Sequence, residues 1–323
     1  VKTNIFLTSA CKHCYSYIGN AEGVARASCL LSTTKQRTEK GSTMKRSQWA
    51  KTAFSCAFAL VSATAAATDY YVSAESGASD NNDGLSAESP FATVDKAITS
   101  AANASDVIHV AAGTYATTAQ WGPNLQSKLI GEGASRDDVV IESAGTYRTL
   151  RMAAGSWLEN VTVVGEGTKK ADKGGAVEMN GGTITNCVFR DGYTTGNNDN
   201  LEGGNLYIGN ASALVVGSLI QNGHATKRGG NVYLNGGTVR NCTIEGGTCD
   251  NVGGNVFIQN GNLENCVVSD SSSSKEGGGI YIQAGSISGS TISNGSGTEG
   301  GAIRMTGGTI TNSTILANGV TRD

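Results

Sequence analysis

The sequence predicts an all-β protein, a right-handed parallel β-helix with a short capping helix at its N-terminal end. The first observation is a Gly-Gly step that recurs along the second half of the chain. It stands at Gly174, Gly203, Gly229, Gly253, Gly277 and Gly300, so the spacings are 29, 26, 24, 24 and 23 residues. A period that drifts in the twenties is typical of a solenoid whose loops vary in length while its strands do not.

The second observation is strict alternation after each Gly-Gly step. Aliphatic residues occupy two positions separated by a single residue, and in a strand such positions point to the same side. We expect both positions to face the interior. The first holds Val177, Leu206, Val232, Val256, Ile280 and Ile303, and the second holds Met179, Ile208, Leu234, Ile258, Ile282 and Met305.

The third observation is a position where only Asn or Gly occurs. Its seven occupants are Asn160, Asn186, Gly217, Asn241, Asn265, Gly289 and Asn312. These residues best tolerate positive φ, so the position predicts a left-handed kink between two short strands. A third turn position rich in Asp, Asn and Gly completes a coil of three strands and three turns. The variable coil length favours the right-handed form over the rigid coil of left-handed β-helices.

Composition narrows the classes of function. The chain has 323 residues with 45 Gly, 2 Pro, 16% charged residues and a net charge of −3. Abundant Gly with few charges indicates many tight turns. There is no basic stripe, so nucleic acid is not expected as a partner. No apolar stretch after the first 70 residues is long enough for a transmembrane helix in the mature chain.

The N-terminal region is interpreted as processed sequence followed by the helix. Residues 44–67 have the layout of a secretory signal, with Lys45 and Arg46 before an apolar stretch and Ala65 in a fitting cleavage site. We therefore interpret residues 1–43 as translation upstream of the true start. Residues 68–106 are expected to form a strand, a loop and a capping helix that begins after Thr93. Residues 107–323 are expected to form the β-helix, which stops within a coil. We interpret this end either as a truncated solenoid or as an end covered by a partner.

The start of the mature chain resembles a known family. "DYYVSAESGASDNNDGLSAESPFATVDKAITSAANASDVIHVAAGTY" is similar to the opening of secreted β-helix proteins of the pectate-lyase-like superfamily. Steps such as Gly174-Gly175-Ala176-Val177 resemble the repeats of polymorphic outer-membrane proteins, which are adhesin-type. The resemblance covers about residues 69–323. It implies the fold, and either an adhesin-like or a polysaccharide-processing role.

The candidate binding site lies between the two inward aliphatic positions, where the outward residue is aromatic in four successive coils. The predicted site consists of Tyr207, Tyr233, Phe257 and Tyr281, flanked by Asn205, Asn231 and Asn255. Exposed rings with neighbouring amides suit sugar binding, and contiguous exposed aromatic residues mark binding surfaces. The alternative is that the rings form a ladder that stabilises the stacked strands.

Loops beside these strands carry charges that an enzyme would need. In pectate-lyase-like enzymes such loops supply Ca²⁺ ligands and a base, so the resemblance offers Asp191, Asp199 and Glu202 for Ca²⁺. It offers Lys227, Arg228 or His224 as the base. The alternative is solvated loop charge, and residues 80–84 are similarly interpreted either as a Ca²⁺ loop or as turn chemistry. We assign no catalytic residue and no metal site, and expect no cofactor, with Ca²⁺ as the alternative.

Three cysteines share one small inward position, namely Cys187, Cys242 and Cys266, whereas Cys249 is expected in a loop. Cys242 and Cys266 lie one coil apart, within reach of a disulfide, but we expect buried free thiols that act as small hydrophobic residues, with the disulfide as the alternative.

Altogether the sequence predicts a secreted or cell-surface repeat protein that binds a polysaccharide or surface glycan without cleaving it, or acts as an adhesin. The alternative function is an extracellular polysaccharide lyase or glycoside hydrolase.

Overall fold

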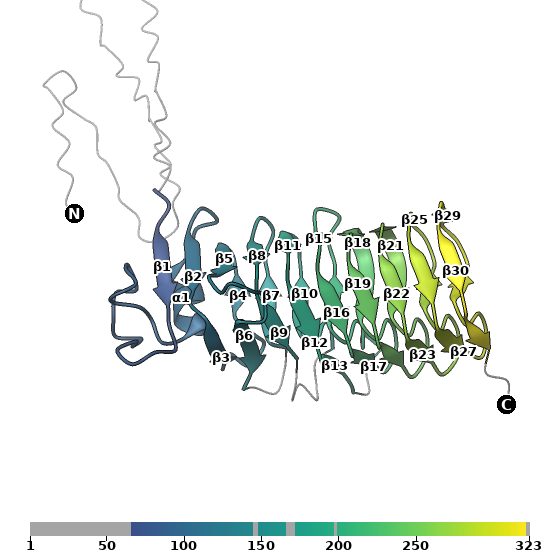
Figure 1. Cartoon of the computed structure of the whole chain (residues 1–323), viewed down its shortest axis with the longest axis horizontal. Helices are drawn as coiled ribbons and strands as arrows, with labels where there is room; N and C mark the ends of the chain where they lie inside the picture. Colours follow the sequence, from purple (N-terminus) through teal and green to yellow (C-terminus); the bar gives the residue numbers. More distant parts are fainter. Residues whose placement is uncertain (1–65, 145–147, 166–171, 197–198, 321–323) are drawn as a thin grey trace, which may run out of the picture. The chain divides into compact units, whose positions relative to one another are not determined.

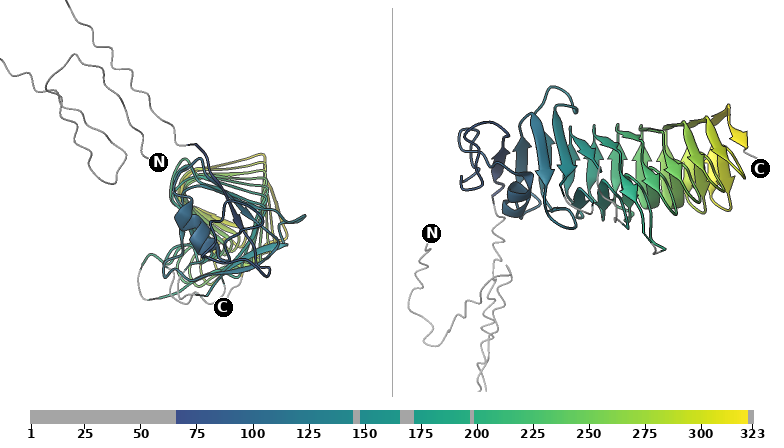
Figure 2. Two further views of the ribbon diagram at one scale, coloured as in Figure 1. Left: turned by 90° about the vertical axis from the view of Figure 1, so that its left-hand side faces the viewer. Right: turned by 90° about the horizontal axis from the view of Figure 1, so that it is seen from below.

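Parallel coils stacked along one axis make up the described part of the chain. A computed structural model describes residues 66–144, 148–165, 172–196 and 199–320. Each strand pairs in parallel with the strand one coil away, and the coils superimpose when seen along the axis (Figure 1, Figure 2). The fold is the predicted right-handed parallel β-helix. The interpretations of residues 1–43 and of nearly all of 44–67 lie outside the described residues.

Three parallel sheets run along the axis. The largest has 16 strands in two columns that fuse in the nine-residue strands β18 and β21. Its members are β1 (Asp69–Val72), β2 (Val107–Val110), β4 (Asn124–Leu125), β5 (Lys128–Gly131), β7 (Leu150–Met152), β8 (Trp157–Glu159), β10 (Val177–Met179), β11 (Thr183–Thr185), β14 (Leu206–Ile208), β15 (Leu214–Val216), β18 (Val232–Arg240), β21 (Val256–Glu264), β24 (Ile280–Ile282), β25 (Ser286–Ser288), β28 (Ile303–Met305) and β29 (Thr309–Thr311).

The second sheet contains nine strands. They are β3 (Gly113–Thr117), β6 (Val139–Ser143), β9 (Thr162–Val164), β12 (Val188–Arg190), β16 (Leu219–Gln221), β19 (Thr243–Glu245), β22 (Val267–Ser269), β26 (Thr291–Ser293) and β30 (Thr314–Leu316).

A third sheet has six strands. Because the largest sheet already takes two strand segments from each coil, the coils that also contribute to this third sheet have strand segments in four places, and the prediction of three strands per coil is wrong. The third sheet consists of β13 (Tyr193–Thr194), β17 (His224–Ala225), β20 (Thr248–Cys249), β23 (Ser271–Ser273), β27 (Gly295–Gly297) and β31 (Gly319–Val320). These strands are two or three residues long, which is too short for alternation to reveal them in a sequence.

The predicted kinks have the predicted backbone. All seven Asn or Gly residues of the kink position have φ between 50° and 59°, beginning with Asn160 (56°) and Asn186 (50°). The third turn position behaves alike, for example at Asp191 (59°) and Asn222 (55°). The Asn186 side-chain amide donates to the Asn160 side-chain oxygen at 3.0 Å, so kinks on neighbouring coils are also joined laterally. Residues that accept positive φ therefore fix the corners of each coil.

The N-terminal end carries the expected helix. Helix α1 (Val94–Ser100) begins after Thr93, whose Oγ1 accepts from the backbone N–H of Lys96 at 3.2 Å. Asp80 braces this cap, because its carboxylate accepts from the backbone N–H and the hydroxyl of Thr93 at 3.0 and 2.7 Å. The Asp80 loop thus uses turn chemistry. Among the described residues, no helix has the length and apolarity needed to span a membrane.

Inward aliphatic side chains from successive coils form one continuous core, and α1 contributes to it with three buried residues. The two predicted inward positions are fully buried as far as Ile282. In the last of these coils Met305 is 43% exposed, and no further described coil lies against it.

The cysteines of the described region are free thiols. Cys187, Cys242, Cys249 and Cys266 are all buried and unpaired by disulfides. The expected loop position of Cys249 is wrong, since this residue lies in β20. The structure thus contains Cys242 and Cys266 as the expected buried free thiols and not as the alternative disulfide.

The loop of residues 131–138 links several coils on the outside of the second sheet. The carbonyl oxygen of Arg136 accepts from the Thr162 hydroxyl at 3.1 Å. The Arg136 guanidinium donates to the carbonyl oxygens of Cys187 and Gly217 at 3.4 and 3.3 Å. A single residue therefore contacts three successive coils beyond its own.

Candidate functional site

The four aromatic residues of the predicted site form a stacked column. Tyr207, Tyr233, Phe257 and Tyr281 pair in register on β14, β18, β21 and β24. The ring centroids lie 5.3, 5.2 and 5.1 Å apart, and the interplanar angles are at most 9°. The predicted alignment of the rings on one face is correct.

The predicted exposure of this column is wrong. Tyr207 is 7% exposed, Tyr233 is 3% and Phe257 is 2%, whereas Tyr281 is half-buried. Residues that directly precede a Gly-Gly step place their side chains against the rings, and two of these side chains are cationic. The Lys173 ammonium lies 4.7 Å from the Tyr207 ring centroid, and the Arg228 guanidinium lies 5.7 Å from that of Phe257. Alternation gives the direction of a side chain but not what covers it, so the column is a second small core.

The flanking amides are likewise internal. Asn205, Asn231 and Asn255 have no exposed surface. The side-chain N–H of Asn205 donates to Asn231 at 2.7 Å, and that of Asn231 donates to Asn255 at 2.6 Å. These three amides therefore cannot meet a ligand, and they join the coils instead.

The charges of the neighbouring loops are paired with one another. Arg228 contacts Glu202 at 2.7 Å, Lys227 contacts Asp199 at 3.8 Å, and Arg190 contacts Asp191 at 2.7 Å. Within the described ranges, no group of three His, Cys, Asp or Glu side chains is placed to hold a metal ion. The three carboxylates offered for Ca²⁺ are not brought together as such a group.

The candidate base His224 is also engaged with its neighbours. Its Nδ1 lies 2.8 Å from the Thr248 hydroxyl, and its ring stacks on Tyr193 with centroids 4.6 Å apart. Its Nε2 lies 3.5 Å from Asp250. Both ring nitrogens therefore face groups of the next coil and not a site shared with Lys227 and Arg228.

Sequence reasoning missed Arg148, which lies at the end of the aromatic column. Its guanidinium is 5% exposed, contacts Asp172 at 2.6 Å and pairs with Glu178, which occupies the ring position one coil before Tyr207. Its Nε also donates to the Lys173 carbonyl oxygen at 3.0 Å. The signal in the sequence was Glu178, an acidic residue at the position that is aromatic in the four following coils. No spacing rule indicated that Arg148 would pair with it.

Burial alters several acid–base groups. Burial raises the pKa of Tyr115 to about 12 and that of the Cys187 thiol to about 12. It also raises the pKa of Cys249 to about 11 and displaces the pKa of Tyr233 upward from its usual range. The thiols of Cys187 and Cys249 stay protonated near neutral pH, so they are packing groups and not nucleophiles.

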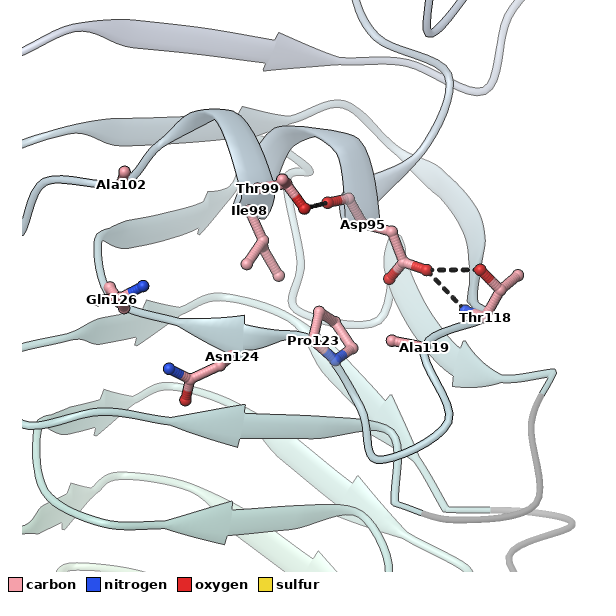
Figure 3. A pocket seen from close by; sticks show the side chains of 9 residues that line it. All are labelled: Asp95, Ile98, Thr99, Ala102, Thr118, Ala119, Pro123, Asn124 and Gln126. Atoms are coloured by element: carbon pink, nitrogen blue, oxygen red, sulfur yellow. Dashed lines mark hydrogen bonds between the residues drawn. The ribbon is translucent and has the colours of Figure 1, made fainter. Parts of the chain in front are cut away.

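A hollow under the capping helix has the features of a ligand site (Figure 3). Its volume is about 400 Å³, within the range of small-molecule sites. Asp95 and Ile98 of α1 face Pro123 and Asn124 across it. The remaining lining residues are Thr99, Ala102, Thr118, Ala119 and Gln126.

Asp95 has one engaged and one free oxygen in this hollow. Its Oδ2 accepts from the backbone N–H and the hydroxyl of Thr118 at 2.7 and 2.8 Å. Its Oδ1 is buried and has no hydrogen-bond partner among the described residues. A buried carboxylate oxygen without a donor calls for an explanation, because such groups are nearly always satisfied. A ligand hydroxyl entering the hollow would satisfy it.

The rest of the lining suits the same kind of ligand. Asn124 and Gln126 bring two side-chain amides, each able to donate and to accept. Ile98 and Pro123 provide apolar surface on the two sides of the hollow. Trp121, which belongs to the loop between Ala119 and Pro123, is 46% exposed. No sequence pattern pointed to this hollow, because its residues come from a helix, a turn and a two-residue strand.

The chain matches no protein-family model and no curated protein sequence. It is similar to the solved structure of pectin methylesterase PemA from Erwinia chrysanthemi, with a TM-score of 0.48, 14% identity, and coverage of 80% of this chain and 92% of that one. It is also similar to that of pectate lyase Pel9A, with a TM-score of 0.39, 14% identity, and coverage of 79% and 78%. This likeness concerns the β-helix architecture and assigns no activity.

Proposed function

We propose that the protein is an exported β-helix repeat protein that binds a polysaccharide or surface glycan without cleaving it. The observation that carries the proposal is the free Asp95 oxygen in a hollow that also presents the amides of Asn124 and Gln126. The aromatic column does not support glycan binding, because three of its four rings are buried and Tyr281 is half-buried.

A sugar matches this hollow chemically. Its hydroxyl groups donate and accept hydrogen bonds, as Asp95 Oδ1 and the two amides require. The C–H faces of a sugar are apolar and can pack against the apolar side chains of Ile98 and Pro123.

Binding without cleavage is favoured by the number of acidic groups. Glycoside hydrolysis ordinarily uses two carboxyl groups on opposite sides of the scissile bond. Among the described residues that line the hollow under α1, Asp95 is the single carboxylate, and half of it is occupied by Thr118. Of the charged side chains beside the aromatic column, which a lyase would need free, Arg148 pairs with Glu178 and Arg228 pairs with Glu202, while Lys173 lies against the Tyr207 ring.

Export and display outside the cell remain part of the proposal. The supporting observation is the signal-like segment at residues 44–67. An adhesin-like role would follow if the glycan belongs to another cell surface.

The test measures retention of the chain on immobilised neutral, acidic and amino polysaccharides. The double variant Asn124→Ala/Gln126→Ala removes both amides, and we expect at least a roughly tenfold weaker retention, since each lost hydrogen bond costs about 1 kcal/mol. Gln283→Ala is the matched control, because Gln283 is exposed on a distant coil. Reducing-end and unsaturated-product assays run alongside on the same polysaccharides.

Retention that is unchanged in the double variant would remove the hollow from the proposal. Retention of no polysaccharide would refute glycan binding as a whole. Appearance of unsaturated or newly reducing ends would replace the binding function with the enzymatic alternative.

A further inference from the structure

A second hollow, of about 510 Å³, lies beside the first two strands at the N-terminal end. Its wall is formed by Tyr71 of β1 and His109 of β2, which pair in register and stack with ring centroids 5.0 Å apart and an interplanar angle of 18°. Pro90 and Ala87, from the loop that follows β1, also line it. The hollow therefore combines an aromatic wall with an apolar loop.

The polar groups around this hollow are acidic. Glu75 and Glu132 line it, and Glu132 Oε1 lies 2.6 Å from His109 Nδ1. Asp69, at the edge, lies 3.5 Å from the other ring nitrogen, His109 Nε2. Carboxylate side chains therefore outnumber the single imidazole around this hollow, so its polar lining is acidic.

Among the described residues that line this hollow, there is no lysine or arginine to offset its charge. Lys128, on the adjacent strand β5, is held 3.3 Å from Glu159 and over the Trp157 ring. Lys96 lies over the Phe91 ring. An anionic ligand would be repelled here, whereas a cationic one would be attracted.

We infer that this hollow binds a saccharide carrying a free amine, with the ammonium group beside Glu75 and Glu132 and the sugar body against Tyr71 and His109. The inference rests on the proposed glycan-binding function and specifies its ligand class. It predicts that polyuronates, the substrates suggested by the fold resemblance, are disfavoured. An ammonium beside an aromatic ring and carboxylates gains both cation–π attraction and charge-assisted hydrogen bonds.

The experiment compares three tetrasaccharides of equal length by calorimetry, made of glucosamine, N-acetylglucosamine and galacturonate units. Titrations are run at about pH 6, above the ordinary pKa of glutamate. We expect the glucosamine tetramer to bind at least about tenfold more tightly than the galacturonate tetramer, as one favourable charge contact would give. Raising the salt should shrink this preference, because the hollow is open to screening ions.

The variants Glu75→Gln and Glu132→Gln keep the shape of the hollow and remove its charge, so together they should reduce the preference to about threefold or less. Glu88→Gln is the matched control, since Glu88 is an exposed carboxylate of the same loop outside the hollow. Melting temperatures verify that all variants are folded.

Equal or reversed preference in the wild-type chain would overturn the inference, as would a preference that survives both Glu variants. If N-acetylglucosamine or neutral glycans bind while the cationic preference is missing, the inference fails and the proposed function stands. If none of the saccharides binds in any assay, both fail. A preference that persists in Asn124→Ala/Gln126→Ala but disappears in the Glu variants would assign it to this hollow.

Discussion

The side-chain amide of Asn231 donates to the side-chain oxygen of Asn255 at 2.6 Å, one coil further along, and both residues are fully buried. Three further hydrogen bonds satisfy the remaining donor and acceptor sites of the Asn231 side chain. It donates to the Glu245 carbonyl at 2.8 Å and accepts from the Gly223 N–H at 2.8 Å and from Asn205 at 2.7 Å. One internal amide thus connects three coils and two turns.

We predict that Asn231→Ala lowers the free energy of unfolding by at least about 3 kcal/mol. The substitution leaves several buried donors and acceptors unsatisfied, at about 1–3 kcal/mol each. Urea denaturation followed by circular dichroism measures the change. Asn180→Ala, at an exposed asparagine, should stay within about 0.5 kcal/mol of wild type. Equal losses in the two variants would contradict the role of the buried amide.

Substitution of glycine by asparagine should have opposite effects on stability at the kink position and at the Gly-Gly step. Gly217 has φ +59° and open space where a side chain would begin, and its equivalents Asn186 and Asn241 adopt the same backbone. Gly217→Asn should therefore be neutral or stabilise by up to about 1 kcal/mol. At Gly229 a Cβ atom would overlap the Val232 carbonyl oxygen. Gly229→Asn should destabilise by several times that amount, as thermal melting of both variants would reveal.

Phe257→Ala should destabilise the protein by about 3–5 kcal/mol, the usual cost of truncating a buried phenylalanine. The ring is 2% exposed and stacks on Tyr233 and Tyr281. Below the melting temperature, retention on glycans should not change. Selective loss of retention with unchanged stability would restore the column as a binding site.

Alkaline pH should weaken the fold through Tyr115. Burial raises its pKa from 10.0 to about 12 in the folded state. The folded protein then keeps a proton that the unfolded chain loses, so the stabilising contribution is complete below about pH 10 and declines between about pH 10 and 12. The decline is at most about 1.4 kcal/mol per pH unit.

Tyr115→Phe checks this pH dependence. Its stability at neutral pH should fall slightly, because the hydroxyl donates to the Ala111 carbonyl at 2.8 Å. Its slope between about pH 10 and 12 should nevertheless be shallower than that of wild type. Denaturation curves across this interval measure both quantities, and parallel slopes would count against the assignment.

The coil could be predicted from the sequence because coil geometry is local. The Asn or Gly at each kink reports a backbone angle, and the alternating aliphatic residues report a direction. These local signals repeat with the coil, so the register of β14, β18, β21 and β24 could be predicted. The same alternation also predicted that Tyr207 and Tyr233 align.

The burial of those rings could not be predicted, because it depends on the residues that directly precede the Gly-Gly steps and not on the ring-bearing strands. Lys173 and Arg228 occupy the position directly before a Gly-Gly step and place their side chains over rings of the column. The residue type at this position varies from coil to coil, so alternation within the ring-bearing strands does not indicate that the rings are covered. The hollow of Asp95 was hidden for a similar reason. It unites α1 with Thr118 and β4, which share no repeat, so its free oxygen emerges only from the folded chain.

The hydrogen bonds of Arg136 divide the coils into two groups that should unfold locally in different ways. Its contacts tie the coils around Thr162, Cys187 and Gly217 to its own loop, so none of these can detach without breaking a bond to another. The described coils after Gly217 lie beyond this brace and depend on their immediate neighbours. Amide hydrogens in the braced coils should therefore exchange with deuterium together and slowly, while those further along should exchange in a graded sequence.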